Sequence, residues 1–138
     1  MKIWRLNILI ILFCVFNSCN EKEDLVKPKT NREFLIEGNW LLQEETLNGN
    51  DIFTKRDSCK RDDKITYRFD HLYFYKDAGM VCSPSGDSTD NWFLINNQNL
   101  LIENQDTFKI EKISTTLLQL SSTKNNSTIL KVYINENE

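Results

Sequence analysis

Apolar and polar residues alternate with a period of two along most of the chain from Leu35 onward. In one segment Ile65, Tyr67 and Phe69 share a face, and the residues between them are polar. Successive side chains of a β-strand point to opposite faces, so this pattern predicts strands with one buried face. The predicted strands are 38–47, 63–69, 71–76, 90–95, 99–103, 106–113, 115–121 and 127–135.

Short segments rich in Asn, Asp, Gly or Pro separate these strands and predict tight connections. Short connections place consecutive strands side by side and antiparallel. Closing eight such strands into a barrel buries their apolar faces and leaves no exposed edge. The sequence therefore predicts an all-β fold, an up-and-down antiparallel eight-stranded β-barrel, with an open β-sandwich as the alternative. A short helical turn is expected at 30–36.

The first 18 residues have the composition of an export signal. Lys2 and Arg5 precede an apolar run at 8–16. A membrane-spanning helix needs about 20 apolar residues, whereas the apolar core of a secretory signal needs only about 7–15. Residues 1–18 are therefore predicted to be a signal peptide, with a retained membrane anchor as the alternative.

The end of this segment, Phe16-Asn17-Ser18-Cys19, resembles the lipobox of bacterial lipoproteins. In those proteins the cysteine becomes the N-terminus of the mature chain and carries acyl chains such as palmitate. The resemblance implies lipidation of Cys19, and two or three chains hold a protein firmly because each buried CH₂ contributes about 0.8 kcal/mol. Ordinary secretion with Cys19 as a free thiol is the alternative.

Residues 19–33 are charged and contain little apolar content, so they are predicted to be a flexible tether to a domain at 34–138. Lys22-Glu23-Asp24 resembles the acidic signal that directs some Gram-negative lipoproteins to the outer face of the outer membrane. The resemblance implies surface display, with retention on the inner leaflet as the alternative.

Charge and residue types narrow the function classes. Removal of Lys2 and Arg5 with the signal peptide leaves 15 basic and 20 acidic residues, a net charge of −5 that argues against nucleic-acid binding. His71 is the single histidine. Asp62 and Asp63 are adjacent, and adjacent strand residues point apart, so they are not expected to act together as an acid–base pair. We expect no enzymatic activity, no metal and no cofactor.

Cys59 and Cys82 are the two cysteines of the predicted domain. An even number of cysteines in an exported domain favours a disulfide. The hairpin formed by 63–69 and 71–76 would bring them to the same end, and the closed loop of about 24 residues corresponds to roughly 3 kcal/mol in the chain-entropy model. A zinc site that adds His71 and a carboxylate is the alternative, although His71 is expected at the far tip of the hairpin.

Gly38-Asn39-Trp40, at the head of the first predicted strand, resembles the G-x-W motif of lipocalins. A longer pattern resembles the small lipocalin-like lipoproteins of Gram-negative bacteria: a cysteine with acidic residues, a strand ending in Phe, a second cysteine, and a tryptophan in the next strand. Its residues are Cys59-Lys60-Arg61-Asp62-Asp63, Tyr67-Arg68-Phe69, Tyr73, Gly79, Cys82 and Trp92. The resemblance implies a lipocalin-like barrel on the outer membrane. His71 stands where that family often has glycine.

Five aromatic residues are predicted to line a ligand cavity or to fill the barrel: Trp40, Tyr67, Phe69, Phe74 and Trp92. Four others are predicted to point outward: Tyr73, Tyr75, Phe93 and Tyr133. Two functions follow as hypotheses. The first is binding of a small apolar ligand inside the barrel. The second is a non-enzymatic interaction protein, a complex subunit or inhibitor, whose loops contact an envelope partner.

Asp87-Ser88-Thr89 resembles the acceptor motif for O-glycosylation of exported proteins in some Gram-negative bacteria. The motif is expected to lie in an accessible loop.

Overall fold

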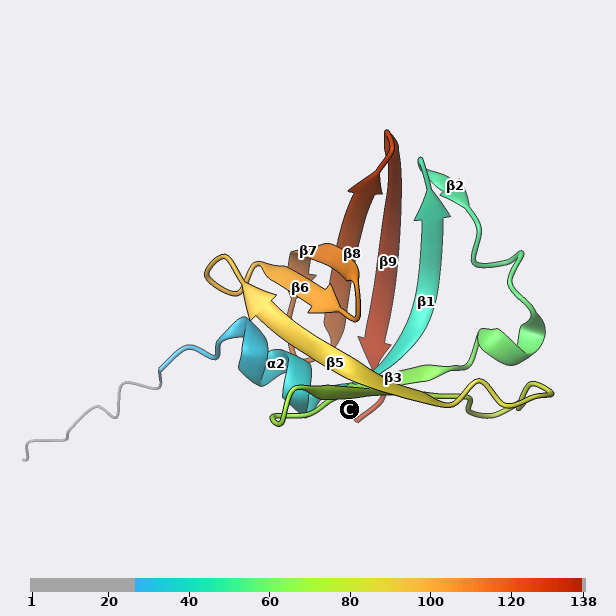
Figure 1. The fold of residues 1–138 in the computed structure, drawn as a ribbon, viewed down its shortest axis with the longest axis horizontal. Coiled ribbons are helices and arrows are strands. Elements are labelled where there is room, and N and C mark those ends of the chain that lie inside the picture. Colours follow the sequence, from blue (N-terminus) through green and yellow to red (C-terminus); the bar gives the residue numbers. More distant parts are fainter. Residues whose placement is uncertain (1–26, 138) are drawn as a thin grey trace, which may run out of the picture.

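Eight antiparallel strands close into a barrel in the computed structural model, which describes residues 27–137 (Figure 1). One short helix and one 3₁₀ turn accompany them. The elements are α2 (Asn31–Glu37), β1 (Asn39–Leu47), β2 (Asn50–Asp51), η1 (Ser58–Lys60), β3 (Lys64–Tyr67), β4 (Leu72–Lys76), β5 (Ser88–Ile95), β6 (Leu100–Glu103), β7 (Asp106–Ile113), β8 (Leu117–Lys124) and β9 (Ser127–Asn135).

Strand β1 closes the barrel because it pairs with two other strands. Its first residues pair with β3, and it also pairs with β9 along most of its length. From β3 to β9 each strand pairs with the next along the chain. The two-residue strand β2 is an extra strand, paired only with the end of β1. The predicted eight-stranded barrel is confirmed, and the open sandwich is excluded.

Helix α2 covers the end of the barrel at which β1 begins. The helix starts at a capping box, in which Thr30 Oγ1 accepts the Glu33 N–H and the Glu33 carboxylate accepts the Thr30 N–H. Leu35 is the buried residue of α2. The indole N–H of the buried Trp40 donates to the backbone carbonyl oxygen of Leu35 at 3.0 Å. Gly38 permits this contact, since a Cβ there would lie 2.1 Å from the Trp40 ring.

The turn between β3 and β4 sets which residues of β4 enter the barrel. Tyr67 pairs with Tyr73 and Ile65 pairs with Tyr75, so all four share the inner face. Phe74 therefore lies on the outer face. The predicted inward Phe74 and outward Tyr73 and Tyr75 are therefore wrong, because cross-strand partners share a face and the inward alternation of β3 continues into β4 across the turn.

Strand β3 ends at Tyr67, two residues earlier than predicted, and Phe69 therefore lies in the turn outside the barrel interior. Phe69 lies between β3 and β4 and is 71% exposed, so its predicted place in the interior is wrong. His71 closes the turn with a φ of 67°, the conformation that glycine adopts most readily.

Strand β9 also presents the face opposite to the predicted one. Tyr133 is 3% exposed and pairs with Leu42 and Leu118, which are both buried. Its predicted outward orientation is therefore wrong. The outward orientation of Phe93 is confirmed, since its side chain is 47% exposed.

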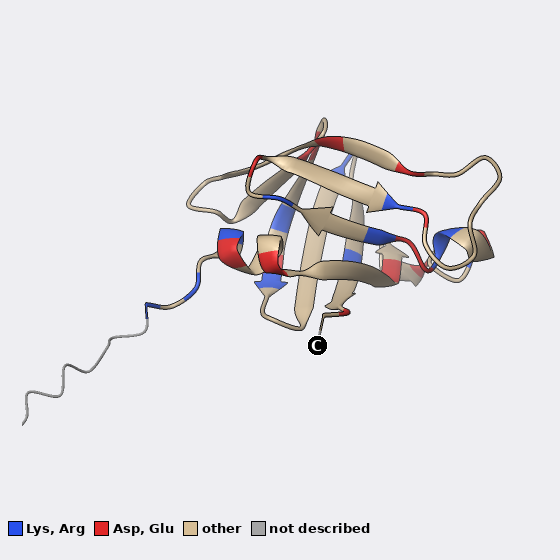
Figure 2. Ribbon diagram, turned by 90° about the horizontal axis from the view of Figure 1, so that it is seen from below, with Lys and Arg blue, Asp and Glu red and all other residues tan. Residues whose placement is uncertain are grey.

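The predicted signal peptide, Cys19 and the first part of the tether lie outside the described residues. Between residues 27 and 137 no helix is long and apolar enough to cross a membrane. Charged residues of both signs are spread over the barrel, and the described residues form no continuous basic stripe (Figure 2).

We predict that Trp40→Ala lowers the free energy of unfolding by about 3–5 kcal/mol, because it removes a fully buried tryptophan side chain that contacts α2 at the covered end of the barrel. Trp40→Phe retains most of the apolar contact and should lose clearly less. Urea unfolding followed by circular dichroism measures both changes. An unchanged midpoint for Trp40→Ala would show that this contact does not hold α2 on the barrel.

Candidate functional site

A cavity of about 240 Å³ lies inside the barrel. Its walls include the last residues of β4 and β6 and the first residues of β5 and β7. In an antiparallel barrel these strand ends lie opposite the start of β1, so the cavity is at the end that α2 does not cover. The segment between β2 and β3, which contains η1, contributes Arg56 and Lys60 to its lining.

Aromatic and aliphatic side chains form part of the cavity wall. Tyr73 and Tyr75 come from β4, Tyr133 from β9 and Phe108 from β7. Burial, followed by the negative charges of neighbouring acidic residues, raises the pKa of Tyr73 to about 12. The tyrosines therefore keep their protons at neutral pH and present hydroxyl groups as well as ring surface.

Glu103 is a buried carboxyl group in this wall, with only 8% of the residue exposed. The Tyr67 hydroxyl donates a hydrogen bond to it. Burial raises the pKa of Glu103, and the hydrogen bond from Tyr67 and the charge of Lys131 counteract part of that shift. Burial and the nearby Glu103 charge raise the pKa of Tyr67 far above its ordinary value, so Tyr67 remains the donor.

Asp63 is a second buried carboxyl group at the cavity, with 5% of the residue exposed. The Tyr75 hydroxyl donates to its Oδ2. Its Oδ1 is buried and has no hydrogen-bond partner among the described residues. Buried polar atoms are usually hydrogen-bonded because an unpaired one costs free energy. Asp63 therefore lines the cavity with a carboxyl group that has one buried acceptor without a partner.

Arg56 reaches the cavity from the segment after β2 and is anchored by Glu45. The Arg56 Nε lies 2.6 Å from Glu45 Oε2. Glu45 faces inward because a β-bulge interrupts β1 between Leu42 and Glu44 and shifts the alternation by one residue. The bulge thus places a carboxylate inside the barrel and brings a guanidinium group to it.

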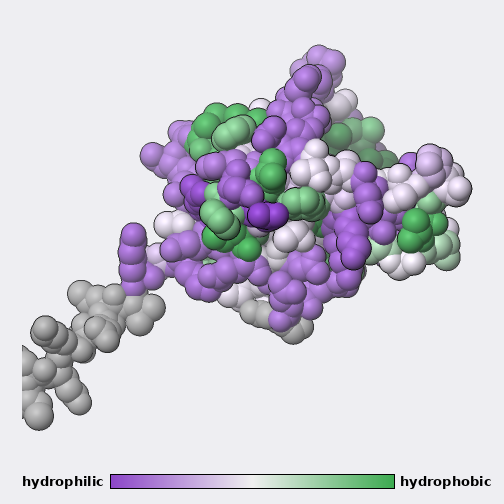
Figure 3. All heavy atoms as spheres, turned by 60° about the horizontal axis from the view of Figure 1, so that its bottom comes forward, coloured by the Kyte–Doolittle hydropathy of each residue, from purple (hydrophilic) through white to green (hydrophobic). Residues whose placement is uncertain are grey.

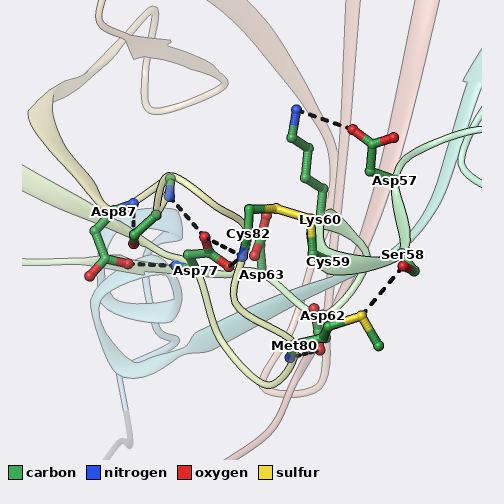
Figure 4. The surroundings of a disulfide bond; sticks show 12 residues. Asp57, Ser58, Cys59, Lys60, Asp62, Asp63, Asp77, Met80, Cys82 and Asp87 are labelled. Carbon is green, nitrogen blue, oxygen red and sulfur yellow. Dashed lines mark hydrogen bonds and ion pairs between the residues drawn. A yellow bond between two sulfur atoms is a disulfide. The ribbon is translucent and has the colours of Figure 1, made fainter.

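A disulfide joins Cys59 in η1 to Cys82 in the segment between β4 and β5, with the Cα atoms 5.2 Å apart (Figure 4). The predicted pairing is confirmed. The zinc alternative is excluded, because it requires both thiolates. The disulfide links the two segments that border the uncovered end of the barrel, one of which supplies Arg56 and Lys60 to the cavity.

Asp77 organises the segment that carries Cys82. Its buried carboxylate accepts the Cys82 N–H at 3.0 Å and the Gly86 N–H at 2.8 Å (Figure 4). Asp62 accepts the Met80 N–H at 2.8 Å in the same way. These acidic residues hold backbone donors of the loop, which is a structural role.

Three of the five predicted aromatic residues lie in the barrel core and not at the cavity. Trp40, Tyr67 and Trp92 are fully buried, and the Trp92 indole donates to the Arg68 carbonyl oxygen at 2.9 Å. They fill the barrel near α2, which confirms the filling role for these three. Phe69 and Phe74 lie outside the interior, as described above.

The polar part of the site was not predicted from the sequence. Asp63 and Glu103 each continue the inward alternation of an apolar strand: Asp63 precedes Ile65 by two residues, and Glu103 follows Leu101 by two. A charged residue at an inward position of a strand is the signal that could have identified both.

The predicted glycosylation motif lies partly in a strand. Ser88 and Thr89 open β5, pair with Tyr75 and Phe74, and are exposed. The expectation of a loop is therefore wrong for these two residues, and glycosylation stays a prediction.

Comparison of the chain with protein-family models, with curated proteins and with solved structures gave no match.

We predict that the stability of the Glu103→Gln variant, relative to the wild type, increases as the pH rises from about 4 to about 8. A carboxyl group whose pKa is raised on folding contributes stability below its unfolded pKa and loses it as the pH rises through the folded pKa. Burial raises the pKa of Glu103, and Gln cannot ionise. The difference in unfolding free energy, variant minus wild type, should therefore increase with pH. Besides burial, the pKa of Glu103 is affected by three neighbouring groups: Tyr67, Lys131 and Asp106.

Glu111→Gln is the matched control, with the opposite sign. Glu111 is exposed, and hydrogen bonds from Lys109 and Ser121 lower its pKa. Its contribution to stability is present above the unfolded pKa and is lost as the pH falls. The Glu111→Gln difference should therefore decrease as the pH rises. Urea unfolding at several pH values measures both, and a pH-independent difference for Glu103→Gln would contradict the assignment.

Proposed function

We propose that the protein is a non-enzymatic lipoprotein of the bacterial cell envelope whose barrel binds one small ligand at the uncovered end. The observation that carries the ligand-binding part is the cavity itself. The barrel core is filled by aromatic and aliphatic side chains near α2, yet about 240 Å³ stays open at the other end. A core selected for stability alone is packed to high density, and a cavity of this size costs stability.

The cavity lining defines the kind of ligand. Tyr73, Tyr133 and Phe108 provide ring surface, which fits the expected apolar ligand. Asp63 and Glu103 provide buried polar groups, which a wholly apolar ligand would leave without partners. We therefore propose a ligand that combines an apolar body with at least one hydrogen-bonding group.

The lipobox resemblance of Phe16-Asn17-Ser18-Cys19 supports the anchor. Lipidated Cys19 would hold the barrel on the outer membrane through the charged tether, with Lys22-Glu23-Asp24 directing it to the cell surface. Helix α2 begins 12 residues after Cys19 and the first barrel strand 20 residues after it, which leaves room for the barrel to face the aqueous phase.

An interaction protein is the second candidate, favoured by exposed apolar side chains. Phe69, Met80, Val81 and Phe93 are each at least 47% exposed. Figure 3 shows that apolar residues on the face it draws form several separate patches among hydrophilic ones. Isolated exposed apolar residues are common on monomeric proteins, whereas a partner site is usually one continuous patch. The ligand-binding function is therefore the better supported.

Native mass spectrometry of the full chain, purified from the membranes of its host, tests both parts. We predict a covalent mass increase for a diacylglycerol and an amide-linked acyl chain at Cys19. We also predict a non-covalent adduct of small-molecule size that is lost when the barrel unfolds, because the cavity lies inside the folded barrel.

Cys19→Ala should move the protein to the soluble fraction without the covalent increase and with the adduct retained. Cys14→Ala is the matched control, since Cys14 precedes the predicted cleavage site and should not affect anchoring. Membrane retention of Cys19→Ala would exclude the lipid anchor. A lipidated protein that carries no adduct and binds no added small molecule would exclude the ligand-binding function.

A further inference from the structure

Two of the three basic side chains at the cavity already have acidic partners. Arg56 is paired with the buried Glu45, at 2.6 Å. Lys60 lies 3.6 Å from Asp57, its neighbour across η1. Arg56 is held by its buried partner, whereas the Lys60–Asp57 pair is largely exposed to solvent and weak.

The remaining charges at the cavity are mainly acidic. The carboxyl groups of Asp63, Glu103 and Asp106 line it, and Lys131 is the remaining basic group of the lining. Even with a proton on Glu103, two carboxylates face one ammonium group. The cavity therefore has a surplus of negative charge after its own ion pairs are made, and this favours a cation over an anion.

The aromatic wall favours a cation for an independent reason. Electron density on the faces of aromatic rings attracts positive charge. Lys131 already uses this attraction, because its Nζ lies 4.7 Å from the centre of the Phe108 ring. Tyr73, Tyr75 and Tyr133 line the same cavity and supply three further rings.

Asp63 provides the hydrogen-bond acceptor that a protonated amine requires. Its Oδ1 is buried without a partner, whereas its Oδ2 accepts the Tyr75 hydroxyl. A carboxylate accepts hydrogen bonds only, so the missing partner is a donor. A charged N–H donor makes the strongest such bond.

Resting on the proposed ligand-binding function, we propose that the cavity takes a small organic cation, a protonated amine attached to an aromatic or apolar body. The ammonium group binds the Asp63 carboxylate, and the body lies against Tyr73, Tyr75 and Tyr133.

Isothermal titration calorimetry of the full-length protein in detergent tests this class with three probes of similar shape. Tyramine carries an ammonium group, 4-ethylphenol is its neutral counterpart, and 3-(4-hydroxyphenyl)propanoate is an anion. Tyramine should bind at least tenfold more tightly than 4-ethylphenol, and the anion should bind more weakly than either.

Asp63→Asn should weaken tyramine binding at least tenfold and leave 4-ethylphenol binding unchanged. Asparagine keeps an oxygen that can accept the Tyr75 hydroxyl, and near-ultraviolet circular dichroism confirms that the barrel stays folded. Asp62→Asn is the matched control. It makes the same change one residue away, on a side chain that accepts the Met80 N–H and does not line the cavity.

The possible negative results distinguish which part of the proposal is wrong. If 4-ethylphenol or the anion binds as tightly as tyramine, the cavity binds ligands but the cation class is wrong. If none of the three binds, this inference is wrong, and the non-covalent adduct in native mass spectrometry decides the ligand-binding function separately. If Asp62→Asn weakens tyramine as much as Asp63→Asn, Asp63 is not the acceptor.

Discussion

The barrel closes through a single strand, β1, which pairs with β3 at its start and with β9 along most of its length. An open eight-stranded sheet would expose two edges and one apolar face. Sharing β1 removes both edges at once and places Trp40, the first large side chain of β1, under α2. The covered end of the barrel depends on this geometry, because Gly38 and Trp40 can fold back toward Leu35 only where β1 enters.

The shared strand also creates the uncovered end. β1 pairs with β3 over three residues only, and beyond Leu41 the two strands separate. The segment between β2 and β3 fills this space, held by the Cys59–Cys82 disulfide and by the Arg56–Glu45 pair. Buried carboxyl groups cost stability unless they are paired. The hydroxyl groups of Tyr67 and Tyr75 offset part of this cost, but Oδ1 of Asp63, like Oδ1 of Asp62, has no hydrogen-bond partner among the described residues.

The sequence predicted the strands and the disulfide well because both depend on local patterns. Strands 106–113 and 127–135 have the predicted bounds, and the others differ by no more than three residues at either end. The orientation of β4 could not be predicted in the same way. Phe74 and its tyrosine neighbours are all apolar enough to face inward, and the pairing of Tyr67 with Tyr73 across the turn decides between them. Similarly, the bulge that turns Glu45 inward has no signal in a pattern of period two.

Native-state amide hydrogen exchange of residues 39–41 tests closure of the barrel most directly. A strand with hydrogen-bonded neighbours on both sides protects consecutive amides, whereas an edge strand protects only alternate ones. We predict slow exchange at consecutive amides of Trp40 and Leu41. Alternation between slow exchange and the rate of an unstructured peptide along these residues would show that β1 is an edge strand, and that the barrel does not enclose the cavity.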